Sequence, residues 1–214
     1  NHQFENKTYM NFEKDRIYHV YNQGNNRKKI FLTRSNYQLF YHKIDEFISP
    51  YADIIAWCLM PNHFHLMILV NEVELFYEKK SKRLLSDSHV LKSNLLKKRT
   101  LNESIGILLR SYTRSINAEH EFTGSLFRQT SKANAINSFK GLQPNFWKSK
   151  IAIFNMLPEN QYPQICFNYI HHNPVKAGLV SKDIDWEFSS ARDYANLRNN
   201  GIVKKELART YVDF

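Results

Sequence analysis

Met60-Pro61-Asn62-His63-Phe64-His65-Leu66-Met67 decides the fold, because this stretch places a turn and two histidines inside an otherwise apolar run. Pro61-Asn62 is typical of a turn, so the run predicts an antiparallel hairpin with strands over residues 54–60 and 63–70. Successive side chains of a strand point to opposite faces, and His63 and His65 therefore project from one face. Two buried imidazoles need a metal ion, a phosphate or a hydrogen-bond network as partner. The alternative is that both histidines have only a structural role.

The sequence on either side of the hairpin predicts an α+β fold. Alternation and helical periodicity indicate a strand over residues 15–21, a helix from the N-cap Ser35 to residue 49, a helix beginning at the N-cap Asn102, and a strand over 126–136. With the hairpin, the order is β-α-β-β-α-β, which is the split βαβ or ferredoxin-like arrangement with an antiparallel sheet. A further helix is expected over about residues 163–173, ended by Pro174 and Gly178.

Composition indicates an ordered protein of one domain. The 214 residues are 43% hydrophobic and 14% aromatic, and glycine and proline together occupy only twelve positions. Cys58 and Cys166 lie in apolar surroundings without metal-like spacing, so we expect buried free thiols and a reducing, cytoplasmic location. No apolar run approaches the roughly 20 residues of a membrane span, and the N-terminal residues lack the apolar region of a signal peptide.

Positive charge predicts a polyanionic partner. The net charge is +10, and residues 79–99 hold eight Lys or Arg and one acidic residue. A solvated surface is the ordinary explanation of such a run, but its concentration in a basic protein favours nucleic acid over an anionic membrane. The candidate contacts to nucleic acid in these basic clusters are Arg27, Lys28, Lys29, Lys97, Lys98 and Arg99.

The late helix carries groups that suit phosphodiester chemistry. Tyr169 and Asn173 are four residues apart and share a helix face. If this face packs beside His63 and His65, the Asn173 oxygen completes a site for a hard cation such as Mg²⁺ or Mn²⁺, with Zn²⁺ as an alternative. The phenol of Tyr169 would then lie above the metal as a nucleophile.

Several motifs together resemble one family. They are Tyr18-His19-Val20-Tyr21-Asn22-Gln23-Gly24-Asn25, the His63/His65 turn, Tyr169-Ile170-x-x-Asn173-Pro174-Val175-Lys176-Ala177-Gly178, and Trp186-Glu187-Phe188-Ser189-Ser190-Ala191-Arg192-Asp193-Tyr194. In this order they resemble the REP-associated tyrosine transposases, a branch of the single-tyrosine HUH transposases. The resemblance covers about residues 9–195 and implies a single HUH transposase-like domain over 1–214 with a tail at 196–214.

The resemblance implies a metal-dependent endonuclease and strand transferase. Its substrate would be single-stranded DNA, cleaved near hairpins through a 5′-phosphotyrosine link that frees a 3′-hydroxyl. Carried over by position, Tyr169 is the nucleophile on the C-terminal helix, His63 and His65 are metal ligands, and Asn173 is the third ligand of a Mg²⁺ or Mn²⁺ ion. Lys176, within the same motif, joins the expected DNA contacts. Both monomers and homodimers occur among related enzymes.

The chain departs from the family pattern in places, and other interpretations remain open. Gln23 stands where the family often has arginine, although the nearby Arg27 can supply a phosphate contact. Tyr112 is the alternative nucleophile, yet its helical spacing with apolar residues is typical of a core position. Two further functions fit the same residues: binding of folded DNA or RNA without cleavage, and a metal-dependent phosphodiesterase that uses water, with Tyr169 only structural.

Overall fold

The histidine-bearing hairpin forms the centre of an antiparallel sheet in the computed structural model, which describes residues 10–78, 96–137, 161–198 and 201–214. The sheet contains β1 (Ile17–Gln23), β2 (Ala52–Met60), β3 (His63–Val70) and β6 (Lys132–Ala135), in the order β2-β3-β1-β6. Every neighbouring pair is antiparallel. The predicted α+β class, the antiparallel sheet and the hairpin are confirmed.

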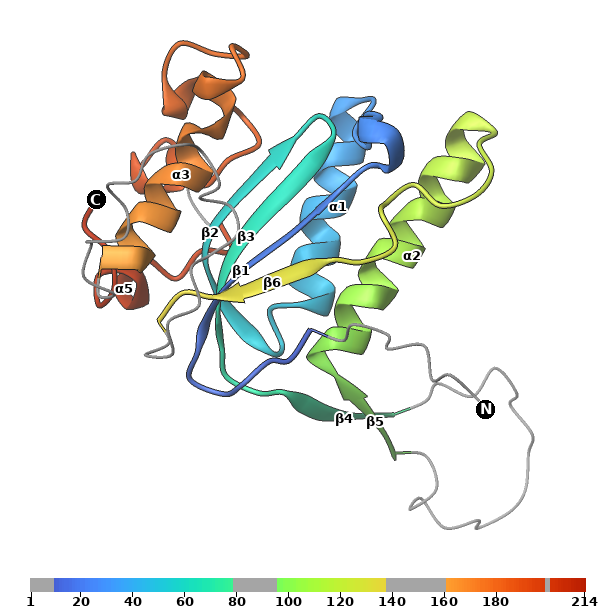
Figure 1. The fold of residues 1–214 in the computed structure, drawn as a ribbon, viewed down its shortest axis with the longest axis horizontal. Coiled ribbons are helices and arrows are strands. Elements are labelled where there is room, and N and C mark those ends of the chain that lie inside the picture. Colours follow the sequence, from blue (N-terminus) through green and yellow to red (C-terminus); the bar gives the residue numbers. More distant parts are fainter. Residues whose placement is uncertain (1–9, 79–95, 138–160, 199–200) are drawn as a thin grey trace, which may run out of the picture.

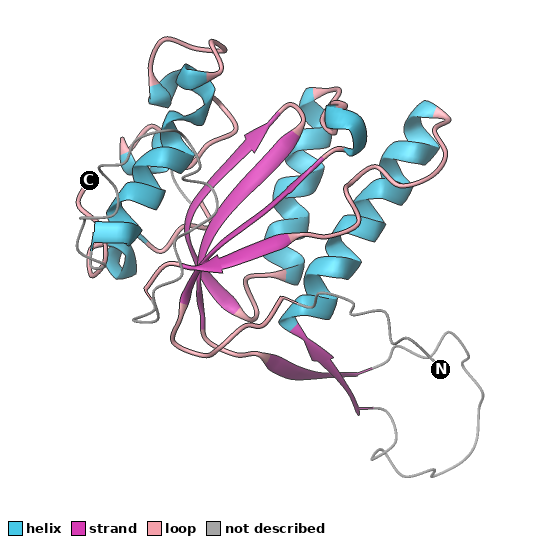
Figure 2. Ribbon diagram, in the orientation of Figure 1, coloured by secondary structure: helices cyan, strands magenta, loops and turns pink. Residues whose placement is uncertain are grey.

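Helices cover both faces of the sheet (Figure 1). The helices α1 (Arg34–Phe47) and α2 (Leu101–His120) lie on one side, and α3 (Tyr162–Lys176) lies on the other. Figure 2 shows the magenta strands between these two groups of helices. Short helical segments complete the chain: η1 (Asn25–Arg27), η6 (Asp183–Asp185), α4 (Ala191–Tyr194) and α5 (Lys205–Ala208).

Each face of the sheet has its own apolar core. The core under α1 and α2 contains large buried side chains such as Phe40, Trp57 and Phe64. The core under α3 contains Met67 and Ile170, together with the two cysteines, which are buried and free as expected. Alternate residues of β3 thus enter different cores, because neighbouring strand side chains point to opposite faces.

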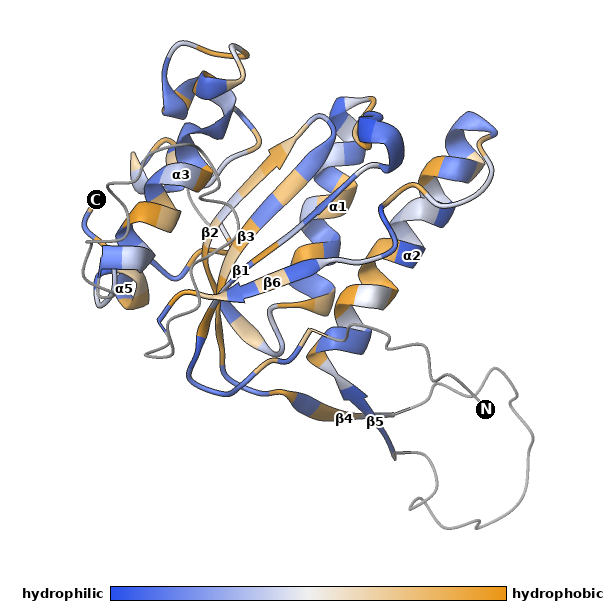
Figure 3. Ribbon diagram, viewed as in Figure 1, coloured by the Kyte–Doolittle hydropathy of each residue, from blue (hydrophilic) through white to orange (hydrophobic). Residues whose placement is uncertain are grey.

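A separate ribbon of two strands projects beyond the sheet. It consists of β4 (Glu74–Glu78) and β5 (Leu96–Thr100), which pair antiparallel. Figure 3 shows hydrophilic colour along β5, in contrast to the apolar strands of the main sheet. Residues 79–95 of the basic segment lie outside the described residues, as do residues 138–160 before α3.

The structure corrects both predicted helix starts. The N-caps are Thr33 and Thr100, not Ser35 and Asn102, so each helix begins two residues earlier. Each threonine forms a reciprocal capping box, in which its side chain accepts from the backbone N–H three residues on and the side chain there accepts in return. This arrangement satisfies two otherwise unpaired backbone donors, so it is preferred over a cap with one bond.

Two further boundaries differ from expectation. The predicted strand over 126–136 is wrong in length, because β6 is confined to Lys132–Ala135 and Phe127 makes only an isolated bridge to Gly24. Pro174 does not end the late helix, which continues to Lys176. A proline has a backbone φ that a helix accepts, and the chain leaves the helix only at Gly178, where φ is +69°. No helix of the described residues is long and apolar enough to cross a membrane.

We expect Thr100→Ala to lower the free energy of unfolding by about 1 kcal/mol, because it removes one side of the α2 capping box. Urea denaturation of the variant and wild type measures this difference. Thr210→Ala, at an exposed threonine outside any helix, is the matched control and should change stability by less than about 0.5 kcal/mol. Equal stability of Thr100→Ala and wild type would contradict the proposed role of the cap.

Candidate metal centre and nucleophile

His63 and His65 lie at the start of β3, on the face covered by α3. Their ring centroids are 4.9 Å apart and nearly perpendicular. Phe64 between them is buried in the opposite core, under α1 and α2. The alternation of a regular strand therefore places both imidazoles together on one face.

The Nδ1 atom of His63 is held by the preceding residue. Asn62 Oδ1 lies 2.6 Å from this nitrogen, while Asn62 Nδ2 donates to the carbonyl oxygen of Arg27 at 3.3 Å. The second bond fixes which end of the Asn62 carboxamide faces the histidine. An amide oxygen can only accept, so His63 Nδ1 carries the proton and Nε2 presents a lone pair.

His65 is oriented in a similar way by another histidine. His65 Nδ1 lies 2.9 Å from His19 Nε2 on the neighbouring strand β1, and both rings are buried. His65 Nε2 has no hydrogen-bond partner among the described residues. With the proton on Nδ1, this buried nitrogen also presents a lone pair, which is the usual state of a histidine that binds a metal through one nitrogen and donates from the other.

Burial keeps these imidazoles neutral. It lowers the pKa of His63 to about 4 and that of His19 to about 3. The pKa of His65 is also lowered well below its ordinary value, first by burial and then by repulsion from its two neighbouring histidines. A neutral imidazole is the form that binds a metal ion, so the site holds its ligands ready at neutral pH.

Tyr169 on α3 lies over the histidines. Its ring centroid is 5.4 Å from that of His65 and 6.0 Å from that of His19, edge-on to both. Burial raises the pKa of the half-buried phenol, and the Asn173 side chain lowers it again in part. The phenol is therefore protonated at neutral pH and needs an activating group in order to attack a phosphodiester.

Asn173 lies one helical turn beyond Tyr169. Its Nδ2 donates to the backbone oxygen of Tyr169 at 2.7 Å, which leaves Oδ1 as the ligand atom that this side chain offers. The described residues contain no group of three His, Cys, Asp or Glu placed to hold one ion. An ion on His63 and His65 would therefore draw further ligands from neutral oxygens such as Asn173 Oδ1 or from water, as Mg²⁺ does readily.

A buried hydrogen-bond centre attaches α3 to the sheet. Ser190 Oγ accepts from the Trp57 backbone N–H at 2.9 Å, donates to the Trp57 carbonyl oxygen at 3.1 Å, and lies 2.7 Å from His171 Nε2. The hydroxyl has one proton to donate and two lone pairs, so His171 Nε2 is the donor in the third bond. His171 is two residues from Tyr169, and this contact therefore fixes the height of the tyrosine over the sheet.

The basic loop Arg27-Lys28-Lys29 is exposed beside the metal candidate. The Pro61 carbonyl oxygen in the β2–β3 turn accepts from the backbone N–H of Ile30 at 2.8 Å. Together with the bond from Asn62 to Arg27, this contact holds the loop against the turn that precedes His63. Lys176 is exposed at the end of α3. Of these four predicted DNA contacts, three lie on the loop next to the turn before His63, and the fourth lies on the helix that carries Tyr169.

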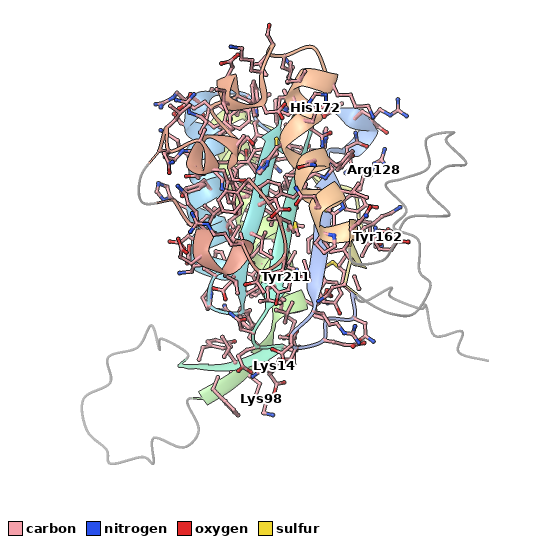
Figure 4. The ribbon with its side chains drawn as sticks, turned by 90° about the vertical axis from the view of Figure 1, so that its left-hand side faces the viewer. Lys14, Lys98, Arg128, Tyr162, His172 and Tyr211 are labelled. Atoms are coloured by element: carbon pink, nitrogen blue, oxygen red, sulfur yellow. The ribbon has the colours of Figure 1, made fainter. Side chains whose placement is uncertain are left out.

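Lys97, Lys98 and Arg99 lie elsewhere. They belong to β5, whose partner β4 begins shortly after the end of β3, so the length of β3 separates the ribbon from His63 by roughly 23 Å. Figure 4 shows Lys98 at the bottom of the molecule and His172 at the top. Lys98 forms an ion pair with Glu74 at 2.8 Å, and the structure does not bring this ribbon to the site.

Tyr112, the alternative nucleophile, is enclosed in the other core. It projects from α2 into the core between the helices and the sheet, is fully buried there, and its hydroxyl donates to the Ile30 carbonyl oxygen at 2.7 Å. Burial raises the pKa of this phenol. The side chain is therefore a structural one, and no phosphodiester can reach its hydroxyl in this fold.

His19 and the Ser190 centre were not among the predicted site residues. The sequence places His19 on a strand and leaves it structural, because its facing partner depends on the register between β1 and β3. The alternation of strand side chains could have indicated that His19 belongs to the site, because His19 and Tyr21 share a strand face in the same way as His63 and His65. His172 is exposed and pairs with Asp183, so it is not part of the site.

The fold resembles one found in a DNA-processing protein. A solved structure of a REP-associated tyrosine transposase bound to a REP hairpin matches with a TM-score of 0.50 and 16% sequence identity, over 95% of this chain and 94% of the other. At this identity the match shows a shared fold. No protein-family model and no curated protein matches the sequence.

The buried histidines predict an acid-labile fold in metal-free protein. Their folded pKa values are lowered, so between pH 6.5 and about 4 the unfolded chain binds protons that the folded chain does not, and stability falls as the pH falls. The fully buried His19 alone accounts for about 2 kcal/mol between pH 7 and pH 5. Urea denaturation in EDTA at the two pH values measures the loss.

His19→Gln supplies the comparison for this prediction. Whatever its stability at pH 7, the variant should lose about 2 kcal/mol less than wild type on going to pH 5, because its side chain does not titrate. An equal loss in both proteins would show that His19 is not held neutral in the folded state.

Proposed function

We propose that this protein is a metal-dependent single-stranded DNA endonuclease and strand transferase, a tyrosine HUH transposase or nuclease that cleaves near hairpins through a 5′-phosphotyrosine intermediate. The supporting observation is the position of Tyr169 over His63 and His65, two imidazoles whose Nδ1 atoms are held by Asn62 and His19 and whose Nε2 atoms remain to bind an ion. In this proposal the sheet and its helices form a ferredoxin-like core, and α3 is the C-terminal helix that carries the nucleophile.

In the reaction, Tyr169 Oη attacks the scissile phosphorus while the bond from phosphorus to the 3′-oxygen breaks. The phosphate stays on the 5′ side as a phosphotyrosine ester, and the phenol proton passes overall to the departing 3′-oxygen. A Mg²⁺ or Mn²⁺ ion on His63, His65 and Asn173 would supply charge stabilisation at the phosphate oxygens. Burial raises the pKa of Tyr169, so the phenol enters the reaction in its protonated form.

Hairpin DNA is the proposed partner. The net charge is +10, and the exposed Arg27-Lys28-Lys29 loop adjoins the turn that carries His63. The REP-associated tyrosine transposase of similar fold is bound to a REP hairpin. Phosphate contacts dominate the affinity of such surfaces and make it fall steeply with salt.

The nucleophile is tested on a denaturing gel with labelled single-stranded hairpin DNA and Mg²⁺ or Mn²⁺. We expect wild type to form a slowly migrating covalent adduct, and Tyr169→Phe to form none. Tyr112→Phe is the matched control, and it should form the adduct while losing about 1 kcal/mol of stability with its buried hydrogen bond.

Two other results on this gel would indicate a different function. Cleavage that depends on metal and survives Tyr169→Phe would indicate a phosphodiesterase that uses water. Hairpin binding without cleavage under any metal would indicate a nucleic-acid-binding protein. Either result would overturn the proposed transesterification.

Metal binding is tested apart from catalysis by thermal unfolding. We expect Mn²⁺ to raise the Tm of wild type in a concentration-dependent way, by linkage to binding in the folded state, and to leave the Tm of His65→Ala unchanged. His172→Ala, at an exposed histidine paired with Asp183, should respond as wild type does. DNA affinity of His65→Ala should remain close to wild type, because phosphate contacts supply it.

If His65→Ala gained as much Tm from Mn²⁺ as wild type, the ion would bind elsewhere and the histidine pair would be structural.

A further inference from the structure

A groove of 1190 Å³ lies on α2, the helix on the face of the sheet away from Tyr169. One wall is α2 itself, and the other is the segment over residues 124–131 that leads into β6. Polar side chains such as Asn117, Gln129 and Ser131 line it. None of these residues takes part in the candidate metal centre.

Three arginines give the groove its charge. Arg110 and Arg114 come from α2, and Arg128 comes from the opposite wall. All three are exposed, and within the described part of the chain no carboxylate forms an ion pair with them. Glu103, the acidic residue of the lining, accepts hydrogen bonds from Thr100 at the helix start. The charge of the groove is therefore available to a ligand.

A glycine forms part of the groove floor. Gly106 lies in the interior of α2, where glycine costs about 1 kcal/mol relative to alanine. A Cβ atom at this position would lie 3.0 Å from Arg110 Nη1, and its three nearest neighbouring atoms all belong to the Arg110 guanidinium. The missing side chain thus lets the Arg110 guanidinium lie across the helix and keeps the floor open.

The second wall is fixed to the end of β1. Asn22 Nδ2 donates to the Arg128 carbonyl oxygen at 3.1 Å and to Ser131 Oγ at 2.8 Å, and the Arg128 N–H donates to the Gln23 carbonyl oxygen at 2.9 Å. Gln23 is the register partner of His63. The groove therefore begins at the same end of the sheet as the histidines, and Figure 4 shows Arg128 in the upper half of the molecule, toward His172 and away from Lys98.

We propose that this groove binds the phosphate backbone of a DNA segment beyond the reacting phosphodiester. The proposal rests on the proposed function for the identity of the polyanion. Arg110 and Arg114 are four residues apart, about 6 Å along the helix, so they can contact neighbouring phosphates of one strand. Guanidinium groups and polar side chains suit phosphate and sugar oxygens, and such contacts position a strand without reading its bases.

The test measures DNA affinity in the Tyr169→Phe background, where no covalent adduct forms. A labelled hairpin with single-stranded flanks is titrated by fluorescence anisotropy at several salt concentrations. Arg114→Ala with Arg128→Ala should weaken binding tenfold or more and make the salt slope shallower by about 1.4, the value for two phosphate contacts with a single strand. Lys182→Ala with Lys204→Ala removes the same charge from exposed positions outside the groove, and should change affinity less than threefold.

A second variant tests whether the shape of the groove matters when the net charge of the protein is unchanged. Gly106→Leu keeps every charge and improves helix propensity, but fills the floor and displaces Arg110. We expect it to be folded with a Tm at least equal to that of its parent, and to bind the flanked hairpin at least fivefold more weakly. Unchanged affinity in Gly106→Leu, or equal losses in the two double variants, would overturn the proposal.

Failure of the groove proposal can be distinguished from failure of the proposed nuclease function. If the groove variants lose affinity while wild type forms no adduct, the groove binds DNA in a protein that does not cleave it. If wild type forms the adduct and the groove variants bind as their parent does, the strand follows another path and the groove proposal fails.

Discussion

Strand β3 has to satisfy two different environments at once, and the rest of the structure follows from that constraint. Phe64 and alternate residues after it fill the core under α1 and α2. His63 and His65 face the other way, toward α3. A slip of one residue in the pairing of β3 would turn both histidines into the aromatic core under α1 and α2 and would turn Phe64 toward α3, so core packing and site geometry select the same register.

The histidines are held by hydrogen bonds that come from different parts of the chain. Asn62 holds His63 from within the turn, and His19 holds His65 from the neighbouring strand. Buried polar groups of this kind are tolerated when each has a partner, and they then fix a side-chain orientation more narrowly than apolar packing does. The atom left over, His65 Nε2, is the one that a metal ligand would use. A pre-organised site requires ligands on a rigid strand and neighbouring residues that hold those ligands by hydrogen bonds.

Local patterns predicted the elements but not the contacts between distant residues. Alternation and the Pro61-Asn62 turn identified the hairpin, because periodicity is set by neighbours in the chain. The predicted helix starts were wrong because a capping box at each helix satisfies two backbone donors, whereas the expected single caps would satisfy one each. The role of His19 depends on which residue of β3 it faces, and that register is a property of the whole sheet.

The basic residues illustrate the same limit. Arg27-Lys28-Lys29 and Lys97-Lys98-Arg99 look alike as sequence, yet one triplet adjoins the turn before His63 and the other lies on a ribbon past the far end of β3. Arg110, Arg114 and Arg128 form a shared groove although they are scattered through the sequence between acidic and neutral residues. Charge density along the chain could not reveal a surface assembled from a helix and a later loop.

The attachment of α3 has a consequence for stoichiometry. Tyr169 reaches His65 within one polypeptide, and His171 and Ser190 anchor the helix to that same subunit's sheet. Under the proposed function, each protomer then carries one nucleophile and can hold one DNA end covalently at a time. Joining two ends in a lone protomer must proceed in turns, with the phenol released by one strand before it accepts the next. The order of events in strand transfer would thus be set by the architecture of a single chain.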